Sequence, residues 1–314
     1  MRRSFRFFPA LLLVIASCCA GQQPPSFRAE VNLVNITAVV RSADGKLLRD
    51  LNQDDFEVLE DGVPQTIRFF ARETELPLSL GLIIDVSGSQ DKFVARHIRD
   101  VETFLHAVLR PSDHVFAVCF GNHLRLVSEE TSSGSAVVDG LERFRKGAGG
   151  MPEIGPREDR ELGTALYDAI YFSILEKLKS AGQARRALLV FSDGEENSSE
   201  HDLLDAIEAA QNTDTLVYSI RYTQKEHGKL TARNKYGIRV MQHLASLTGA
   251  ADFDALASDL ETVFTQISDE LRAMYQIGYV SSSDRAHDGT FRKLIIRTKA
   301  QEATVRAKTG YYAR

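Results

Sequence analysis

A short run of oxygen-bearing residues follows the most apolar segment of the chain. Residues 78–86 form a nearly continuous apolar run, and Asp85, Ser87 and Ser89 occupy alternate positions at its end. Side chains spaced in this way can turn toward one point, and Gly88 lets the backbone make that turn. A carboxylate and two hydroxyls are the hard oxygen donors that Mg²⁺, Mn²⁺ or Ca²⁺ requires. A simpler alternative is that a serine caps the next helix while Asp85 ends the strand.

Two further polar residues are expected at the same place. Thr164 opens a long amphipathic segment, and Asp193 follows the apolar run 187–192 directly before Gly194. Strand ends and helix starts meet at one edge of a doubly wound sheet, so both residues can converge on the Asp85 loop. The sequence therefore predicts one divalent-metal site made of Asp85, Ser87, Ser89, Thr164 and Asp193.

The segment that must position these residues runs from residue 76 to 274. Within it, apolar strands alternate with amphipathic helices, which is typical of βαβ units on a parallel sheet. Strands are expected at residues 78–86, 114–120, 124–127, 187–192 and 215–222. The last helix is expected to place one apolar face on the sheet, made of Leu256, Leu260, Val263, Phe264, Ile267, Leu271 and Met274.

Two short β regions flank this segment, at residues 27–75 and 275–314. Asp44-Gly45, Asp61-Gly62 and Asp288-Gly289 are pairs that tolerate the positive φ angles of tight turns. Strands are expected at residues 275–280, 291–298 and 303–312. Each region is too small to bury both faces of a sheet by itself, so we expect one discontinuous β-sandwich. The predicted fold is α/β, a doubly wound, mainly parallel sheet with a smaller β-sandwich.

The first twenty residues are predicted to be a signal peptide. Three arginines precede the apolar run 7–16, and small residues follow it. This run is shorter than the ~20 residues that span a membrane. Ile15-Ala16-Ser17-Cys18 resembles a lipobox, in which Cys18 would be lipidated, whereas Cys18-Cys19-Ala20 also suits ordinary cleavage. We expect an exported protein, periplasmic, envelope-bound or secreted, with membrane contact only through a lipid on Cys18.

Composition argues against several classes of protein. The formal net charge is −5 and the sequence pI is about 5.9. There is therefore no global positive field to attract nucleic acid. Outside the leader Cys119 is the only cysteine, which excludes a disulfide framework. No cation lies beside Cys119 in the sequence, so a small buried hydrophobe is expected rather than a reactive thiol.

With these residues the chain resembles the von Willebrand factor A domain family over roughly residues 77–274. Its metal-ion-dependent adhesion site (MIDAS) reads Asp-x-Ser-x-Ser, a distant Thr, and an Asp before Gly. The resemblance implies that Ser87, Ser89 and Thr164 coordinate an ion directly or through water, while Asp85 and Asp193 act largely through water and hydrogen bonds. Mg²⁺ or Mn²⁺ is expected, Ca²⁺ less so, with one position open to a Glu or Asp of a partner protein. The overall layout resembles exported A-domain-related proteins common in acidobacteria.

Catalysis is the competing use of such an ion, since a metal with an exchangeable water can activate it. The sequence has no His-Glu-x-x-His, no Gly-x-Ser-x-Gly and no phosphate-binding glycine loop. We therefore expect a protein-binding module, for adhesion or as a scaffold, rather than an enzyme. The alternatives are a metal-assisted hydrolase and a structural envelope protein whose metal stabilises the fold.

Two loops are expected beside the metal, at residues 147–162 and 221–237. The second is locally basic, with Arg221, Lys225, Lys229, Arg233 and Lys235. Cations beside a metal that binds a carboxylate would attract an acidic partner; the alternative is an ordinary solvated loop.

The remaining charged residues are expected to have no special role. Asp54-Asp55 and Glu195-Glu196 are interpreted as solvated turns, with Glu195 near enough to Asp193 to alter its electrostatics. His114 and His123 are expected at the surface or hydrogen-bonded, because they stand at strand ends.

Overall fold

The computed structural model describes residues 33–72, 76–156, 163–182, 184–282, 288–300 and 302–313. The predicted leader, Cys18 and the linker after it lie outside these residues, as do residues 27–32 and 73–75 of the predicted β region. Within the described part, no helix is long and apolar enough to cross a membrane.

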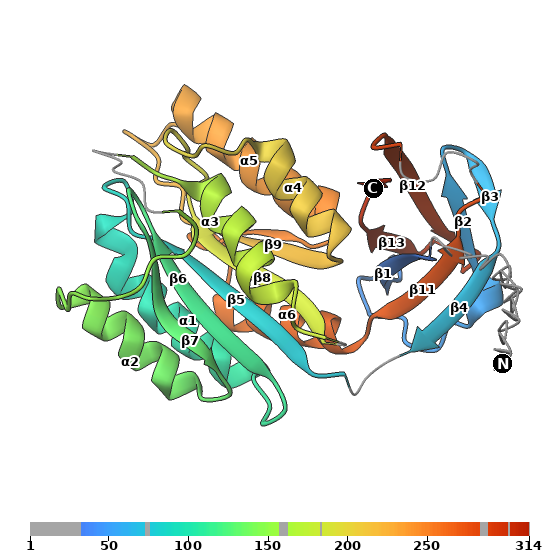
Figure 1. The fold of residues 1–314 in the computed structure, drawn as a ribbon, viewed down its shortest axis with the longest axis horizontal. Helices are drawn as coiled ribbons and strands as arrows, with labels where there is room; N and C mark the ends of the chain where they lie inside the picture. The colour runs from blue at the N-terminus through green and yellow to red at the C-terminus, as the bar shows by residue number, and fades with distance from the viewer. Residues whose placement is uncertain are drawn as a thin grey trace, which may run out of the picture. The chain divides into compact units, whose positions relative to one another are not determined.

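A six-stranded sheet occupies the middle of the chain (Figure 1). Its strand order is β10-β9-β8-β5-β6-β7, and all neighbours are parallel except the pair β6 and β7. The strands are β5 (Leu78–Asp85), β6 (His114–Phe120), β7 (Leu124–Thr131), β8 (Arg185–Ser192), β9 (Thr215–Arg221) and β10 (Asp252–Asp254). Every residue of β5 and of β9 is buried, as expected for strands covered on both faces.

Helices cover both faces of this sheet (Figure 1). One face carries α1 (Val94–Val108), α2 (Gly134–Arg145) and α6 (Leu260–Arg272), and the other carries α3 (Leu166–Phe172), α4 (Leu203–Asn212) and α5 (Ala232–Thr248). A π-helical segment, Ser173–Leu178, continues α3, and a 3₁₀ turn, Asp91–Phe93, precedes α1. Alternate side chains of β5 separate the two cores: Leu82 and Ile84 belong to the first, Ile83 to the second.

Two four-stranded antiparallel sheets, ordered β13-β1-β11-β4 and β14-β12-β2-β3, complete the fold. Their strands are β1 (Leu33–Arg41), β2 (Phe56–Glu60), β3 (Val63–Gln65), β4 (Ile67–Arg72), β11 (Tyr275–Val280), β12 (Phe291–Thr298), β13 (Thr304–Ala307) and β14 (Gly310–Tyr312). Each sheet mixes strands from both ends of the chain; for example, Ile36 of β1 pairs with Ile277 of β11. One apolar cluster draws residues from both sheets. The predicted fold class, a mainly parallel α/β sheet with a smaller β-sandwich, is confirmed.

Two details differ from the sequence-based expectation. The segment 303–312 is not one strand, because residues 304–307 pair with β1 and residues 310–312 pair with β12, and Lys308 and Thr309 between them contact the α/β part. The Lys308 ammonium donates to the carbonyl of Gln211, 2.9 Å away, and the Thr309 amide donates to the carbonyl of Leu247, 3.2 Å away. Leu256 and Met274 were expected on the last helix but lie outside it: Leu256 precedes α6 and is 40% exposed, and Met274 follows its C-cap and is buried.

Candidate metal centre

Asp85 is the last residue of β5 and is fully buried at the carboxyl edge of the sheet. Its Oδ1 accepts hydrogen bonds from the amide of Ser87, at 2.9 Å, and from the Ser87 hydroxyl, at 2.5 Å. The Ser87 and Ser89 hydroxyl oxygens are 3.3 Å apart. The loop thus gathers its three predicted donor side chains in one place.

Asp193 reaches this loop because β8 is the parallel neighbour of β5. The hydroxyl of Ser192, the last residue of β8, donates to Asp85 Oδ2 at 2.5 Å. Asp193 follows, with its Oδ1 accepting from the amide of Glu195 at 3.0 Å. Its Oδ2 accepts from the side-chain amide of Gln90 at 2.6 Å. One hydrogen bond therefore joins Asp193 to Gln90, directly after the motif loop, and another joins the adjacent Ser192 to Asp85.

Thr164 arrives from the segment before α3. The amide of the next residue, Ala165, donates to the carbonyl of Gly121, 3.0 Å away. Gly121 itself lies against the motif loop, since a Cβ added there would be 3.6 Å from the Ser87 nitrogen. The Thr164 amide donates to Asn197 Oδ1 at 2.8 Å. The structure thus places all five predicted residues at one sheet edge.

The electrostatics of this edge favour a bound cation. Burial raises the pKa of Asp85 to about 7, and the negative charge of Asp193 acts in the same direction. Hydrogen bonds from Ser192 and Ser87 oppose the rise. Two carboxylates buried together repel each other. A divalent cation between them would offset that repulsion.

The donor chemistry also fits a hard divalent ion. Three hydroxyls and two carboxylates offer only oxygen, which suits Mg²⁺, Mn²⁺ or Ca²⁺. In the described part of the chain, no three His, Cys, Asp or Glu side chains are grouped to hold a metal. As the resemblance to the adhesion-site pattern implies, a metal here would be held by Ser87, Ser89 and Thr164 together with water, with Asp85 and Asp193 behind them.

The interpretation of Glu196 as part of a solvated turn was wrong. Its carboxylate accepts from the amides of Leu166 and Tyr167, at 2.6 and 3.1 Å, which are free donors in the first turn of α3. The amides of Ser198 and Ser199, at 2.7 and 2.8 Å, also donate to it. Glu196 therefore caps α3 and holds the segment that carries Thr164. In the sequence, only its position shortly after the Asp193-Gly194 pair indicated that Glu196 could belong to this site.

The predicted basic loop offers fewer exposed cations than the sequence suggested. Arg221 ends β9, is 8% exposed and lies 2.6 Å from Asp252, so it is not available to a partner. Lys225, Lys229, Arg233 and Lys235 are exposed. Arg233 lies 3.6 Å from Glu195, next to the metal residues.

The start of α5 packs directly against the predicted metal residues. A Cβ added at Gly237 would be 2.4 Å from the carbonyl oxygen of Asp193. Arg233 lies one turn before Gly237 on the same helix, so this cation is held beside the candidate site. The other predicted loop, residues 147–162, is described only up to residue 156. In it, the amide of Ile154 donates a hydrogen bond to the Leu124 carbonyl of β7, 3.1 Å away.

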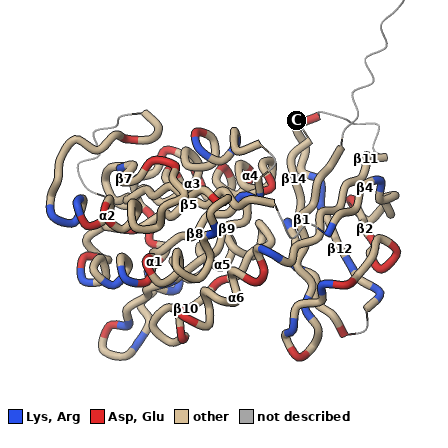
Figure 2. Tube along the Cα trace, turned by 90° about the horizontal axis from the view of Figure 1, so that it is seen from below, with Lys and Arg blue, Asp and Glu red and all other residues tan. Residues whose placement is uncertain are grey.

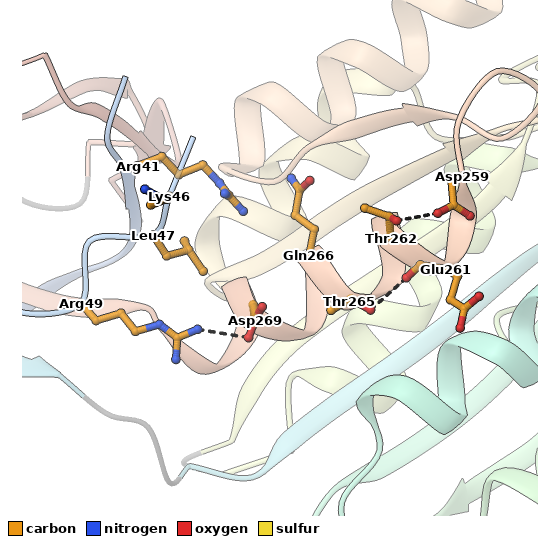
Figure 3. A pocket seen from close by; sticks show the side chains of 10 residues that line it. All are labelled: Arg41, Lys46, Leu47, Arg49, Asp259, Glu261, Thr262, Thr265, Gln266 and Asp269. Atoms are coloured by element: carbon orange, nitrogen blue, oxygen red, sulfur yellow. Dashed lines mark hydrogen bonds and ion pairs between the residues drawn. The ribbon is translucent and has the colours of Figure 1, made fainter. Parts of the chain in front are cut away.

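A separate cleft of about 680 Å³ lies between α6 and residues 41–49 (Figure 3). Its cations come from one side, Arg41, Lys46 and Arg49, and its acids come from α6 and its N-cap, Asp259, Glu261 and Asp269. None of the five predicted metal residues lines it. Across the described residues, Figure 2 shows both signs of charge distributed along the trace, in the α/β part and in the sandwich alike.

No protein-family model and no curated protein matches this chain. Among solved structures it is similar to an aerotolerance-related membrane protein from Bacteroides fragilis, at 16% identity and TM-score 0.46, over 62% of this chain and 98% of that one. It is also similar to a von Willebrand factor type A protein from Catenulispora acidiphila, at 10% identity and TM-score 0.46, over 91% and 74%. A third is proximal thread matrix protein 1 from the mussel byssus with a zinc-occupied MIDAS motif, at 11% and 0.46, over 68% and 50%.

At these identities the likeness concerns the fold alone. The mainly parallel sheet, the helices on both faces and the polar edge described above agree with the architecture that the resemblance to the von Willebrand factor A domain family implies. The five residues of the adhesion-site pattern stand at the expected edge of this domain.

Proposed function

We propose that this protein is a metal-dependent protein-binding module, for adhesion or as a scaffold, that captures a carboxylate of a partner through the Asp85 edge. The observation that carries the proposal is the pair of buried carboxylates, Asp85 and Asp193, whose negative charges act on each other, with hydroxyl side chains beside them. Because the hydroxyl ligands are neutral, an ion bound there keeps much of its charge. Such an ion, Mg²⁺ or Mn²⁺, would supply an electrophilic point that attracts an anionic oxygen.

The surroundings favour an acidic protein partner. Four exposed cations, Lys225, Lys229, Arg233 and Lys235, lie on the loop and helix that reach Asp193. Positive side chains around a carboxylate-binding point accelerate the encounter with an acidic segment. The predicted leader would deliver such a module outside the cytoplasm, where envelope or secreted partners are found. Neither nucleic acid nor a lipid surface is part of the proposal, apart from a lipid on Cys18.

The test is capture of partners from an envelope extract, with and without Mg²⁺. Wild-type protein is compared with Asp85→Ala and with Asp91→Ala, which removes an exposed carboxylate from the 3₁₀ turn next to the site. We expect Mg²⁺-dependent capture by wild type and by Asp91→Ala, and its loss in Asp85→Ala. Equal recovery in all conditions would sink the proposal.

The steering role of the four cations is tested separately, on the partner so identified. Replacing Lys225, Lys229, Arg233 and Lys235 by glutamine should slow association and flatten its dependence on salt. The dissociation rate of the partner should change less, because the four substituted positions lie at the rim of the proposed binding site. Unchanged association kinetics would remove the acidic-partner part of the proposal.

The two alternatives, a metal that only stabilises the fold and a metal-assisted hydrolase, give different results in simple assays. A metal that only stabilises the fold predicts a large loss of thermal stability on chelation and no metal-dependent capture. A metal-assisted hydrolase predicts turnover of an ester or peptide that disappears with chelator. We expect neither the large loss nor the turnover.

A further inference from the structure

Gln90 lies directly after the motif loop and is 1% exposed. Its backbone is held on both sides: its amide donates to the Ser87 carbonyl at 2.8 Å, and its carbonyl accepts from the Phe93 amide at 2.7 Å. Its side-chain Nε2 donates to Asp193 Oδ2 at 2.6 Å. A buried side chain anchored in this way spans from the motif loop to the carboxylate that follows β8.

The nitrogen and the oxygen of the Gln90 side-chain amide differ in their hydrogen bonding. Nε2 must face Asp193, because reversing the amide would set its oxygen against a carboxylate oxygen. Oε1 is buried and has no hydrogen-bond partner among the described residues. An unpaired buried amide oxygen is costly, so such an atom in a native fold calls for a donor that completes it. Since both atoms are attached to one carbon, this acceptor lies beside the Asp193 carboxylate at the candidate site.

We propose that Gln90 is a specificity-determining residue of the metal site, which orients Asp193 through Nε2 and accepts at Oε1 a hydrogen bond from a water molecule of the ion's hydration shell. This inference rests on the proposed function and adds which ion the site selects. Mg²⁺ gives up its waters reluctantly and is usually bound with several of them. A buried acceptor for such a water therefore favours an ion that arrives hydrated.

Two substitutions separate this role from simple packing. Gln90→Met keeps the approximate size but removes both the donor and the acceptor, so we expect Mg²⁺ affinity, measured by calorimetry, to fall about tenfold. Gln90→Glu keeps an acceptor oxygen but adds a negative charge beside Asp193. We expect Gln90→Glu to melt lower than Gln90→Met in chelator, yet to bind Mg²⁺ at least as tightly as wild type. If Gln90 only fills space, the Mg²⁺ affinities of the two variants should instead follow their melting temperatures.

Gln211 provides a matched control elsewhere in the fold. It is also a buried glutamine, 2% exposed, with Nε2 donating to the Leu247 carbonyl at 2.9 Å and an Oε1 that has no partner in the described part of the chain. Gln211→Met should lower the melting temperature and leave Mg²⁺ affinity unchanged. The role of Gln90 is refuted by any of three results: Gln90→Met within twofold of wild type, Gln90→Glu as weak as Gln90→Met, or Gln211→Met equally weakened.

These outcomes also distinguish the inference from the proposed function. If wild-type protein binds Mg²⁺ and captures a partner while Gln90→Met does the same, only the role of Gln90 fails. If wild-type protein binds neither Mg²⁺ nor Mn²⁺, both fail together.

Discussion

Glu270 of α6 joins the α/β part to the β-sandwich through a buried carboxylate. Its side chain is fully buried and accepts from Arg41 of β1, at 2.7 Å, and from Arg306 of β13. Gln266 and the hydroxyl of Tyr218 complete its hydrogen bonds, each at 3.1 Å. This one carboxylate thus balances two guanidinium groups that come from opposite ends of the chain.

We predict that Glu270→Gln destabilises the protein by about 3 kcal/mol. Removing one partner of a buried ion pair typically costs about 3–5 kcal/mol. The lower end applies, because the Arg41 and Arg306 side chains remain 23% and 27% exposed and keep some contact with water. At about 2–4 °C per kcal/mol for a chain of this size, the melting temperature should fall by about 6–12 °C.

The preceding residue supplies the control. Asp269 pairs with Arg49 at 3.1 Å at the rim of the cleft in Figure 3, and both side chains are about half exposed. An exposed pair contributes at most about 1 kcal/mol, so Asp269→Asn should lower the melting temperature by less than about 4 °C. Differential scanning fluorimetry of both variants makes the comparison. If Glu270→Gln melts no lower than Asp269→Asn, the buried network does not stabilise the fold.

The same carboxylate sets a dependence on pH. Burial alone would raise the pKa of Glu270, but the charge of Arg306 and the hydrogen bonds from Arg41 and Gln266 outweigh it, so the pKa lies below its ordinary value of 4.5. A depressed pKa in the folded state means that Glu270 stabilises fully above 4.5 and loses this effect as the pH falls through the lowered value. The gap in melting temperature between wild type and Glu270→Gln should therefore narrow below pH 4.5. A gap that stays constant down to pH 3 would contradict this assignment.

Three further variants or probes test other parts of the structure. Gly194→Ala should destabilise the site by about 1–3 kcal/mol in urea unfolding, because Gly194 has φ +78° and a Cβ there would be 2.3 Å from the Gly237 carbonyl oxygen. Glu196→Gln should lower stability by about 1–2 kcal/mol and weaken Mg²⁺ binding in calorimetry, since one of its two acceptor oxygens becomes an NH2 group that faces amide donors. Cys119 is 1% exposed and burial raises its thiol pKa, so iodoacetamide should modify it only after unfolding, as peptide mass spectrometry can show; labelling of Cys119 in the native protein would be contrary evidence.

Much of the fold followed from local patterns. β11 and β12 have the predicted limits, residues 275–280 and 291–298, because alternating side chains and Asp-Gly turns act over a few residues. The break between β13 and β14 was not predicted. Lys308 and Thr309 contact α4 and α5, and a contact with residues tens of positions away leaves no periodic signal.

The residues of the candidate site also divide into those that local spacing groups and those that only the tertiary fold brings together. Asp85, Ser87 and Ser89 could be grouped from sequence, because three alternate positions after one strand share a direction whatever the rest of the chain does. Gln90 could not be added to them. Its contact with Asp193 spans 103 positions and depends on β8 lying beside β5.

The sequence by itself determined the types of element, the apolar faces and the polar loop of Asp85, Ser87 and Ser89, since these depend on short-range spacing. Only the tertiary structure decided what each polar residue does. Asp269 and Glu270 are adjacent acids on one helix, yet one is about half exposed and the other is fully buried between two arginines. Successive helical residues point about 100° apart, and the partners that separate the two roles come from strands more than 200 residues earlier and about 36 residues later.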